Sequence, residues 1–335
     1  MTSDRPPLAS GALDRDAATR LDPELLRSAM SDPSARLLMM RGVEIPVIDT
    51  SDSVAIAWSV PSALDVPGAA ESETGTPAPE STPDVYIGRI DGAPVFARAI
   101  PAQSSGETVE AGERAPESPT GHPEAQWVHP FLVGARLSDA ERETIGVASA
   151  LLRWHESGRF SPREGSLTSP VQGGWARLDA RGGEHFPRTD PAVIVMIEHE
   201  DRILLGSNAL WETGRFSLLA GFVEAGESLE QAVAREVFEE SGVQLDGITY
   251  VTSQPWPFPR SLMLGFRARL AAGADPQHLV ADPAEISELR WFTRAELQHP
   301  APDLTLPMPL SIARWMIDRW VAEGDDRTPR DIREH

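Results

Sequence analysis

The sequence predicts an α+β protein in which a smaller β-rich N-terminal domain precedes an α/β domain. Short strand-like apolar runs dominate the first part of the chain, whereas strands alternate with helices from Pro191 onward. Between these patterns, apolar residues in 138–157 recur at the spacing of a helix that leads from one domain to the next. The 335 residues, of which 41% are hydrophobic, suffice for two separate cores.

The composition excludes several classes of protein. The chain has no cysteine, so disulfides, thiolate zinc sites, iron–sulfur clusters and cysteine nucleophiles are all ruled out. It carries 51 acidic and 30 basic side chains, for a formal net charge of −21, and a broad basic groove for nucleic acid is therefore not expected. No apolar run approaches the roughly 20 residues that span a bilayer, and residues 1–30 lack the apolar core of a signal peptide. We expect a cytoplasmic protein that makes no membrane contact.

Shifts in composition place the domain boundaries. The predicted segments are a flexible N-terminal tail at 1–30, a β-rich domain at 31–137, a linker helix with an irregular region at 138–188, an α/β domain at 189–322 and a C-terminal tail at 323–335. A short helix is expected near Pro23–Met30. Two stretches rich in Pro, Ser, Thr and Glu, at about 66–83 and 101–125, cannot bury enough apolar surface to become ordered, so we expect disordered inserts there.

Local patterns predict the individual elements. In the β-rich domain, strand-like runs occur at 37–40, 43–48 and 54–58. Val85–Ile90 and Pro94–Ala97 flank Asp91-Gly92, a dipeptide that favours the positive-φ turn of a β-hairpin. In the linker, Ser138 can cap a helix, and Glu141 stands three positions later, as in a capping box. The α/β domain is expected to contain a strand from Pro191, a turn at Asp201-Arg202, a strand at 203–205, a long acidic helix, strands at 247–252, 263–270 and 288–292, and a helix from about Pro309.

The acidic helix carries the strongest chemical signal. Ser228 can cap its start, and Gly242 is a natural C-terminal stop. Glu236, Glu239 and Glu240 stand at positions i, i+3 and i+4, so their carboxylates share one face of the helix. Like charges placed there destabilise the helix and oppose its dipole unless a cation offsets them. Clustered carboxylates suit Mg²⁺ or Mn²⁺, and the alternative is a solvated acidic face.

The stretch from Gly221 to Val243 matches the Nudix box: Gly, five residues, Glu, seven residues, then Arg-Glu-apolar-any-Glu-Glu-any-Gly-apolar. The chain therefore resembles the Nudix hydrolases, which implies an α/β/α sandwich that cleaves nucleoside diphosphates linked to another moiety. The resemblance implies metal ligation by Glu236, Glu239, Glu240 and the carbonyl of Ala220. It implies structural support from Gly221, Glu227, Arg235 and Gly242. The three glutamates are the candidate catalytic residues, and Glu239 is favoured as the base although the choice among them stays open.

The proline–aromatic segment that follows the box is expected to be a stiff loop. Three prolines alternate with Trp256 and Phe258, which suits stacking on a nucleobase because little entropy remains to be lost on binding. The segment is similar to the signature of the NADH pyrophosphatases (NAD⁺ diphosphatases). This resemblance implies substrate contacts by Gln254, Pro255, Trp256, Pro257, Phe258, Pro259, Arg260 and Ser261. The alternatives are a hydrophobic plug that ties the segment to the core and, for Arg260, an exposed surface cation.

Further positions resemble the same family across about residues 150–320. The resemblance implies substrate contacts at Phe186, Phe222 and Ala313 and a further metal ligand at Glu285. Core packing is the alternative for Phe222, and a helix-start carboxylate is the alternative for Glu285. Proteins of this family are generally homodimers, so a homodimer is expected.

The chain departs from the family at a zinc site. Family members commonly carry two Cys-x-x-Cys pairs, whose positions fall here on or near Ser161, Glu164, Asp179 and Gly182. No thiolate site can form, and no zinc is expected, so the region is interpreted as a degenerate zinc ribbon. His155 and His185 remain nearby, and we interpret them as structural or exposed histidines.

The leading hypothesis is a Mg²⁺- or Mn²⁺-dependent hydrolase that cleaves the pyrophosphate of NADH or NAD⁺ to nicotinamide mononucleotide and AMP. The same resemblance allows removal of the NAD cap from RNA 5′ ends, for which a local groove suffices. A third hypothesis is a non-catalytic module that senses a nucleotide, but its expected mark, a broken glutamate set, is not found in this sequence. A scaffolding role has only the acidic inserts in its favour.

Overall fold

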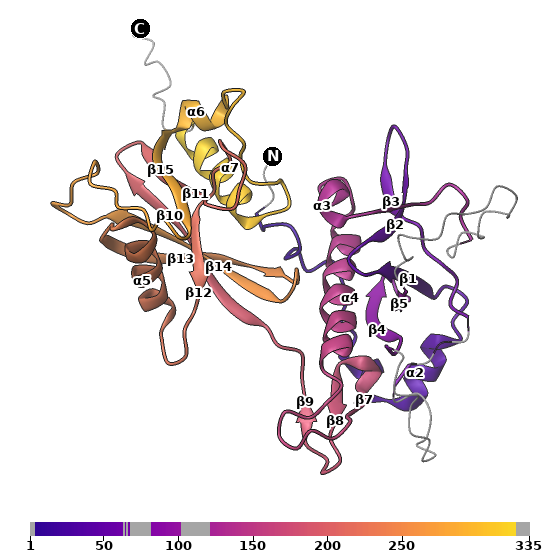
Figure 1. Ribbon diagram of the computed structural model, residues 1–335. Coiled ribbons are helices and arrows are strands. Elements are labelled where there is room, and N and C mark those ends of the chain that lie inside the picture. Colours follow the sequence, from indigo (N-terminus) through magenta and orange to yellow (C-terminus); the bar gives the residue numbers. More distant parts are fainter. Residues whose placement is uncertain (1–3, 63, 65, 68–81, 102–120, 326–335) are drawn as a thin grey trace, which may run out of the picture. The chain divides into compact units, whose positions relative to one another are not determined.

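The structure is a computed structural model that describes residues 4–62, 64, 66–67, 82–101 and 121–325 (Figure 1). The chain divides into two compact units. The C-terminal unit comprises Met1–Ala9, Thr189–Trp256 and Ser261–His335, and the N-terminal unit comprises Ser10–Arg188 and Pro257–Arg260. Most of the two expected inserts lies outside the described residues. No described helix is both long and apolar enough to cross a membrane.

Small sheets and a long helix build the N-terminal unit. Its elements up to residue 157 are α1 (Ala17–Leu21), α2 (Pro23–Met30), β1 (Arg36–Arg41), β2 (Ile45–Asp49), β3 (Val54–Ile56), β4 (Val85–Ile90), β5 (Ala93–Ile100), β6 (Gln126–Val128), α3 (Pro130–Val133) and α4 (Asp139–Ser157). One sheet has the strand order β1-β5-β4 and another has the order β3-β2-β6. The predicted hairpin is confirmed: β4 and β5 are antiparallel, and Asp91 and Gly92 at its turn have φ angles of 52° and 81°.

Helix α4 is the linker helix that the sequence predicts. The Ser138 hydroxyl accepts a hydrogen bond from the Glu141 backbone N–H at 3.3 Å, and the Glu141 carboxylate accepts one from the Ser138 backbone N–H at 3.1 Å. This capping box satisfies N–H groups that a helix start otherwise leaves unpaired. The apolar face of α4, which includes Ile145 and Leu151, packs in one core with Val85 of β4 and other strand residues.

The segment before residue 31 differs from the expected flexible tail. Leu13 and Leu26 are buried. The Glu143 carboxylate on α4 accepts hydrogen bonds from the Ser10 hydroxyl at 2.7 Å and from the Leu13 backbone N–H at 2.9 Å. A buried acceptor that satisfies loop amides leaves no periodic pattern in the sequence, and composition alone therefore predicts a tail.

Residues 158–188, which the sequence presents as irregular, contain a small antiparallel sheet. Its strands are β7 (Ser169–Val171), β8 (Ala176–Leu178) and β9 (Glu184–His185), in the order β7-β8-β9. None of these strands is longer than three residues, so the alternation of buried and exposed side chains is too short to recognise.

One mixed sheet forms the centre of the C-terminal unit. The elements of the unit are β10 (Asp190–His199), β11 (Arg202–Asn208), β12 (Leu219–Phe222), α5 (Leu229–Ser241), β13 (Leu245–Trp256), β14 (Ser261–Leu270), β15 (Ile286–Thr293), α6 (Arg294–Gln298) and α7 (Ile312–Asp325). The strand order is β13-β14-β10-β11-β15, and β12 pairs with β10. Helix α7 begins later than expected and continues into the segment from residue 323 that the sequence presents as a tail.

Helices cover both faces of this sheet. Successive side chains of a strand point to opposite faces. On β10, Val193 and Val195 pack with Val237 of α5, whereas Ile194 packs with Ile317 of α7. Helices α5 and α7 therefore lie on opposite sides of the sheet (Figure 1). The expected α/β/α sandwich is therefore confirmed for the C-terminal unit.

The proline–aromatic segment begins as a strand rather than as a loop. β13 runs as far as Trp256, which pairs with Ser261 of β14. β13 lies at the edge of the sheet, where Pro255 can occupy a position whose N–H would have no strand partner. Only Pro257–Arg260 forms the turn between the two strands.

Candidate active site

The loop between β12 and α5, and the helix itself, place the acidic residues. The Ser228 hydroxyl accepts from the Gln231 backbone N–H at 3.2 Å, and the Gln231 side chain accepts from the Ser228 backbone N–H at 2.8 Å. Gly242 ends the helix in the left-handed conformation, with φ 71°. The three glutamates of the motif lie in the last turns before this stop.

Arg235 joins the loop to the helix. Its Nε and Nη2 donate to the two carboxylate oxygens of Glu227 at 2.7 and 2.9 Å, and Nη2 also donates to the Phe222 carbonyl at 3.0 Å. Its Nη1 lies 3.0 Å from a carboxylate oxygen of Glu236 and 3.0 Å from one of Glu239. The hydrogen bonds from Arg235, with one from a backbone amide, hold the pKa of Glu227 at about 2. A single guanidinium therefore fixes the loop and offsets part of the acidic face.

Gly221 lies directly against Glu236. A Cβ at position 221 would come within 1.9 Å of the Glu236 Cδ, so any other residue would displace that carboxylate. Burial raises the pKa of Glu236; the Arg235 guanidinium lowers it, and the charges of Glu239 and Glu285 raise it further. The close approach of strand and helix thus confines one carboxylate of the motif.

Glu240 is buried, with 7% of its surface exposed, and its Oε2 has no hydrogen-bond partner among the described residues. Burial raises the pKa of Glu240 to about 8, and the charges of Glu236 and Glu285 add to the shift. A hydrogen bond from the backbone of Ala220 acts in the opposite direction. A buried carboxylate in this state is destabilised unless a proton or a cation joins it.

The chemistry of these carboxylates fits a divalent cation, because carboxylate oxygens are the hard donors that Mg²⁺ and Mn²⁺ prefer. In the described part of the chain, however, no three acidic or histidine side chains are spaced so as to hold a metal ion. Arg235 accounts for this arrangement, since it draws Glu236 and Glu239 toward its guanidinium. Glu239 is 55% exposed and Glu285 is also exposed, whereas Glu240 is buried.

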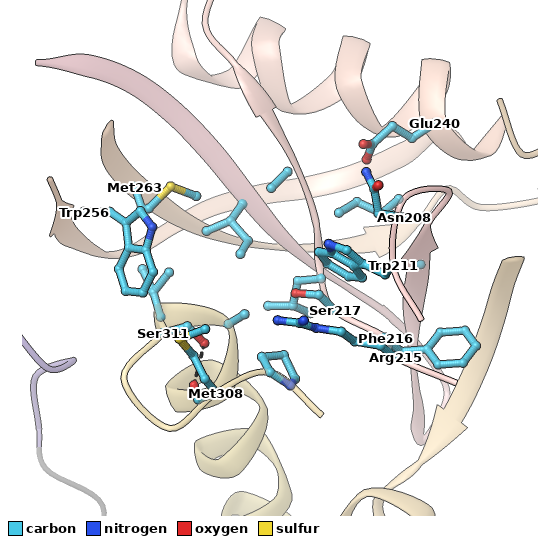
Figure 2. Close-up of a pocket in the computed structure, with 18 of the residues that line it drawn as sticks. Asn208, Trp211, Arg215, Phe216, Ser217, Glu240, Trp256, Met263, Met308 and Ser311 are labelled. Carbon is cyan, nitrogen blue, oxygen red and sulfur yellow. Dashed lines mark hydrogen bonds between the residues drawn. The ribbon is translucent and has the colours of Figure 1, made fainter. Parts of the chain in front are cut away.

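A cavity of about 320 Å³ opens beside Glu240 (Figure 2). The residues in its lining that the sequence predicts for the site are Ala220, Glu240, Gln254, Trp256 and Ala313. Figure 2 shows Glu240 and Asn208 together at one side of the cavity and Trp256 at the other. The structure therefore brings the buried carboxylate and an indole ring into one cavity.

The lining also contains residues that sequence reasoning did not single out, among them Asn208, Trp211 and Arg215. The Asn208 side chain accepts from the Leu210 backbone N–H at 2.9 Å, and the Asn208 carbonyl accepts from the Trp211 backbone N–H at 3.0 Å. The Arg215 guanidinium carbon lies 5.0 Å from the centroid of the Trp211 ring. The sequence shows only a tryptophan and an arginine in a short segment after a predicted strand. It does not show that this segment lies beside Glu240, and the two residues therefore could not be assigned to the site.

Two predicted substrate contacts differ in their exposure. Gln254 has no exposed surface, and its Nε2 donates to the carbonyls of Pro7 at 2.7 Å and Leu310 at 2.9 Å. Its Oε1 accepts from the Ile312 backbone N–H at 2.7 Å, so this amide positions the start of α7. Phe222, by contrast, is 59% exposed, which excludes core packing as its role.

The predicted contacts at Pro257–Arg260 group with the N-terminal unit, whereas Pro255, Trp256 and Ser261 belong to the C-terminal unit. The Pro257 carbonyl accepts from the Ser149 hydroxyl at 3.1 Å. The Phe258 ring packs edge-on against Phe131, with 5.0 Å between the ring centroids, beside the core of that unit. These contacts match the alternative of a hydrophobic plug for Phe258. In the same unit, Phe186 is 57% exposed.

The positions at which family members carry cysteine ligands for zinc form two hydrogen-bonded turns in this chain. The Ser161 hydroxyl lies 3.5 Å from Oδ2 of Asp179, and Arg181 pairs with Glu164 at 2.8 Å. Oδ1 of Asp179 accepts from the backbone N–H groups of Arg181 at 3.0 Å and Gly183 at 2.7 Å. The side chains present do not fit a thiolate zinc site, and hydrogen bonds link the turns.

Comparisons with known proteins cover most of the chain. A family model described as the NUDIX domain matches residues 188–314. A solved NUDIX hydrolase from Nitrosomonas europaea is 23% identical, with a TM-score of 0.41, and the match covers 51% of this chain and 94% of that one. The protein named NAD-capped RNA hydrolase NudC from Salmonella paratyphi B (strain ATCC BAA-1250 / SPB7) is 42% identical over 181 residues, which are 54% of this chain and 66% of the relative. The protein of the same name from Mycobacterium bovis (strain BCG / Pasteur 1173P2) is 38% identical over 321 residues, which cover 92% of each chain. As its two motifs predict, the chain belongs to the Nudix hydrolases and, within them, to the NudC family.

Proposed function

We propose that this protein hydrolyses the pyrophosphate bond of NADH or NAD⁺ and releases nicotinamide mononucleotide and AMP. The observation that best supports the proposal is the cavity shared by the Trp256 indole and the Glu240 carboxylate, whose Oε2 has no hydrogen-bond partner among the described residues. The end of the cavity that contains the carboxylate suits a pyrophosphate with its metal. The end that contains the indole suits the planar ring of a nucleotide. The names of the NudC relatives are consistent with a dinucleotide of the NAD type.

Nudix hydrolases generally use divalent metals, and Mg²⁺ or Mn²⁺ is the proposed metal here. When bound, such an ion neutralises phosphate charge and lowers the pKa of the attacking water. The residues proposed to hold it are Glu236, Glu239, Glu240, Glu285 and, through its carbonyl, Ala220. The unpaired Oε2 of Glu240 and the contact of Gly221 with Glu236 support this assignment.

Glu239 is the proposed general base, which orients the attacking water or accepts its proton. Its side chain is 55% exposed, so water reaches the carboxylate, whereas Glu240 is buried. Arg235 donates to Glu239 at 3.0 Å and to Glu227, so the arginine restrains this carboxylate relative to the loop. Removal of the guanidinium should therefore reduce the rate without removing any proposed metal ligand.

Removal of the NAD cap from RNA is the second candidate, and the printed names of the relatives favour it. The bond cleaved is the same pyrophosphate, so the cavity could receive the cap in the same way as free NAD⁺. A net charge of −21 opposes a long RNA footprint. We therefore expect the dinucleotide, rather than the RNA chain beyond it, to supply most of the affinity.

The test is product analysis on NADH, NAD⁺, ADP-ribose and NAD-capped RNA with each metal. The proposal predicts nicotinamide mononucleotide and AMP from the dinucleotide, and a rate about 10²-fold lower for Glu240→Gln. Glu230→Gln, on the exposed first turn of the same helix, is the matched control and should retain the wild-type rate. Preferential cleavage of capped RNA in competition with NADH would favour the second candidate. Tight binding of NADH without turnover would favour a non-catalytic module.

The homodimer and the cytoplasmic location expected from the sequence belong to the same proposal. Light scattering on the purified protein measures the first, and fractionation of the expressing cells measures the second. A monomer at micromolar concentration would remove the dimer from the proposal and leave the hydrolytic chemistry untouched.

A further inference from the structure

The cavity contains one cationic side chain for which the sequence predicts no role. Arg215 is half-buried, and it is the one arginine in the described lining. No ion pair joins it to a carboxylate of the described chain, whereas Arg235 pairs with Glu227 at 2.7 Å and Arg314 with Asp318 at 2.7 Å. A guanidinium has five N–H donors and no acceptor, so Arg215 offers unused donors to an anion.

The backbone at Arg215 is held in one position. Gly214 has φ 88°, and a Cβ there would lie 2.1 Å from the Asp303 carbonyl oxygen. The Phe216 backbone N–H donates to the Thr305 carbonyl at 3.0 Å, and the Thr305 N–H donates to the Gly214 carbonyl at 2.8 Å. Phe216 is 3% exposed and packs in the core against Phe292, and Arg215 beside it forms an isolated β-bridge with Thr305.

The side chain of Arg215 is also restrained. Figure 2 shows its guanidinium beside the Trp211 ring and directed toward the cavity. The distance of 5.0 Å from the guanidinium carbon to the ring centroid is that of a cation–π contact. Because backbone and side chain are both ordered beforehand, little conformational entropy is lost when an anion binds to this guanidinium.

We propose that Arg215 binds the phosphate of the mononucleotide half whose ring enters this cavity, and that the indoles of Trp211 and Trp256 contact that ring. The inference rests on the proposed function, since it assumes a dinucleotide of the NAD type, and it names the residue that holds one phosphate. The paired donors of a guanidinium match two oxygens of one phosphate. The ring can be nicotinamide or adenine, because both are planar, and the shared chemistry is a nucleoside monophosphate.

The test compares two ligand pairs that differ only in the phosphate: nicotinamide mononucleotide with nicotinamide riboside, and AMP with adenosine. Binding to the full-length protein is measured by calorimetry or NMR in EDTA. Arg215→Ala should weaken one monophosphate about tenfold or more and leave its nucleoside within about twofold. The pair that responds identifies the half that enters the cavity. Arg215→Lys should lose less affinity than Arg215→Ala, because it keeps the charge but not the paired donors.

Arg290→Ala is the matched control. Arg290 also stacks on an aromatic ring, 4.4 Å from the centroid of Phe292, and pairs with Glu296, but it does not line the cavity. This variant should bind every ligand as the wild type does. Equal weakening of a monophosphate and its nucleoside by Arg215→Ala, or no weakening of either monophosphate, would overturn the inference.

The inference and the proposed function can fail separately. Arg215→Ala could weaken the binding of a monophosphate although the wild type leaves NADH intact with Mg²⁺ and Mn²⁺. The proposed hydrolysis would then be wrong, and the proposed phosphate contact would still hold. If the wild type hydrolyses NADH and Arg215→Ala does so with unchanged KM, the hydrolase stands and the phosphate contact is wrong.

Discussion

Gly221 faces Glu236 so closely that a Cβ on the glycine would lie 1.9 Å from Cδ of the carboxylate. Gly221→Ala must therefore displace Glu236 from the position where it supports the proposed chemistry. We expect kcat/KM for NADH to fall about 10²-fold, the loss that a displacement of about 1 Å produces at a catalytic centre. Circular dichroism should show that the variant is folded. A folded variant with more than half of the wild-type kcat/KM would contradict the close contact.

Arg235 stabilises the protein through Glu227, and this contribution depends on pH. The hydrogen bonds from Arg235 hold the pKa of Glu227 at about 2, below the ordinary value of 4.5. A depressed carboxylate pKa stabilises the fold above pH 4.5, and the contribution is lost as pH falls toward 2. Arg235→Lys should therefore lower the urea midpoint more at pH 7 than at pH 3, since a lysine cannot bind both oxygens. Arg290→Lys is the surface control. If Arg235→Lys lowers the urea midpoint by the same amount at both pH values, Arg235 does not stabilise the fold through Glu227.

His155 should make the fold weaken on acidification. Its Nδ1 lies 2.7 Å from an Arg177 guanidinium nitrogen and its Nε2 lies 2.8 Å from the Gly174 carbonyl, a pair of contacts that fits the neutral ring. Burial lowers its pKa from 6.5 to about 4. Below pH 6.5 the His155 ring becomes protonated in the unfolded chain but stays neutral in the folded protein. The free energy of unfolding therefore falls by about 2 kcal/mol between pH 8 and pH 5.

Denaturant unfolding of a His155→Gln variant measures that contribution. The variant should lose this part of the pH dependence, and His299→Gln, at an exposed position, should keep it. If His155→Gln retains the wild-type slope of unfolding free energy against pH, the histidine is not the source.

Asp179 should stabilise the two turns at the positions where family members carry cysteine ligands for zinc. It accepts backbone hydrogen bonds from Arg181 and Gly183, and Oδ2 lies 3.1 Å from Nε2 of His185. Asp179→Ala should lower the melting temperature by about 2–4 °C, the effect of losing one capping side chain in a chain of this size. Asp179→Asn keeps an acceptor oxygen and should lose less. EDTA should leave the difference in melting temperature between the wild type and Asp179→Ala unchanged, and a smaller difference in EDTA would point to a metal at these turns.

Local signals predicted the parts of the fold that depend on neighbouring residues. The capping boxes at Ser138 and Ser228 and the stop at Gly242 each need only a few consecutive positions, and the structure shows all three. The sequence also predicted the α/β/α sandwich, because the motif on α5 resembles the Nudix box and this resemblance implies the fold. Coverage of both faces of the sheet by helices also explains why six consecutive residues of β10 are buried.

The features that the sequence did not predict depend on distant segments. Arg215 enters the cavity because Phe216 pairs with Thr305, about ninety residues further along the chain. Glu143 orders the segment near Leu13, which composition presents as a tail. The prolines predicted a loop, but Pro255 lies in β13, because a strand at the edge of a sheet tolerates a proline. In each case the decisive contact joins residues that no local pattern relates.

The metal dependence of product release from NADH tests the proposed hydrolysis at the step where water cleaves the pyrophosphate. Wild-type protein, Glu240→Gln and Glu230→Gln would each be incubated with NADH in EDTA and then with excess Mg²⁺ or Mn²⁺, with products separated by chromatography. We expect no products in EDTA, equimolar mononucleotides from the wild type and Glu230→Gln with metal, and a rate about 10²-fold lower for Glu240→Gln. NADH left intact by the wild type with both metals, or a wild-type rate for Glu240→Gln, would contradict it.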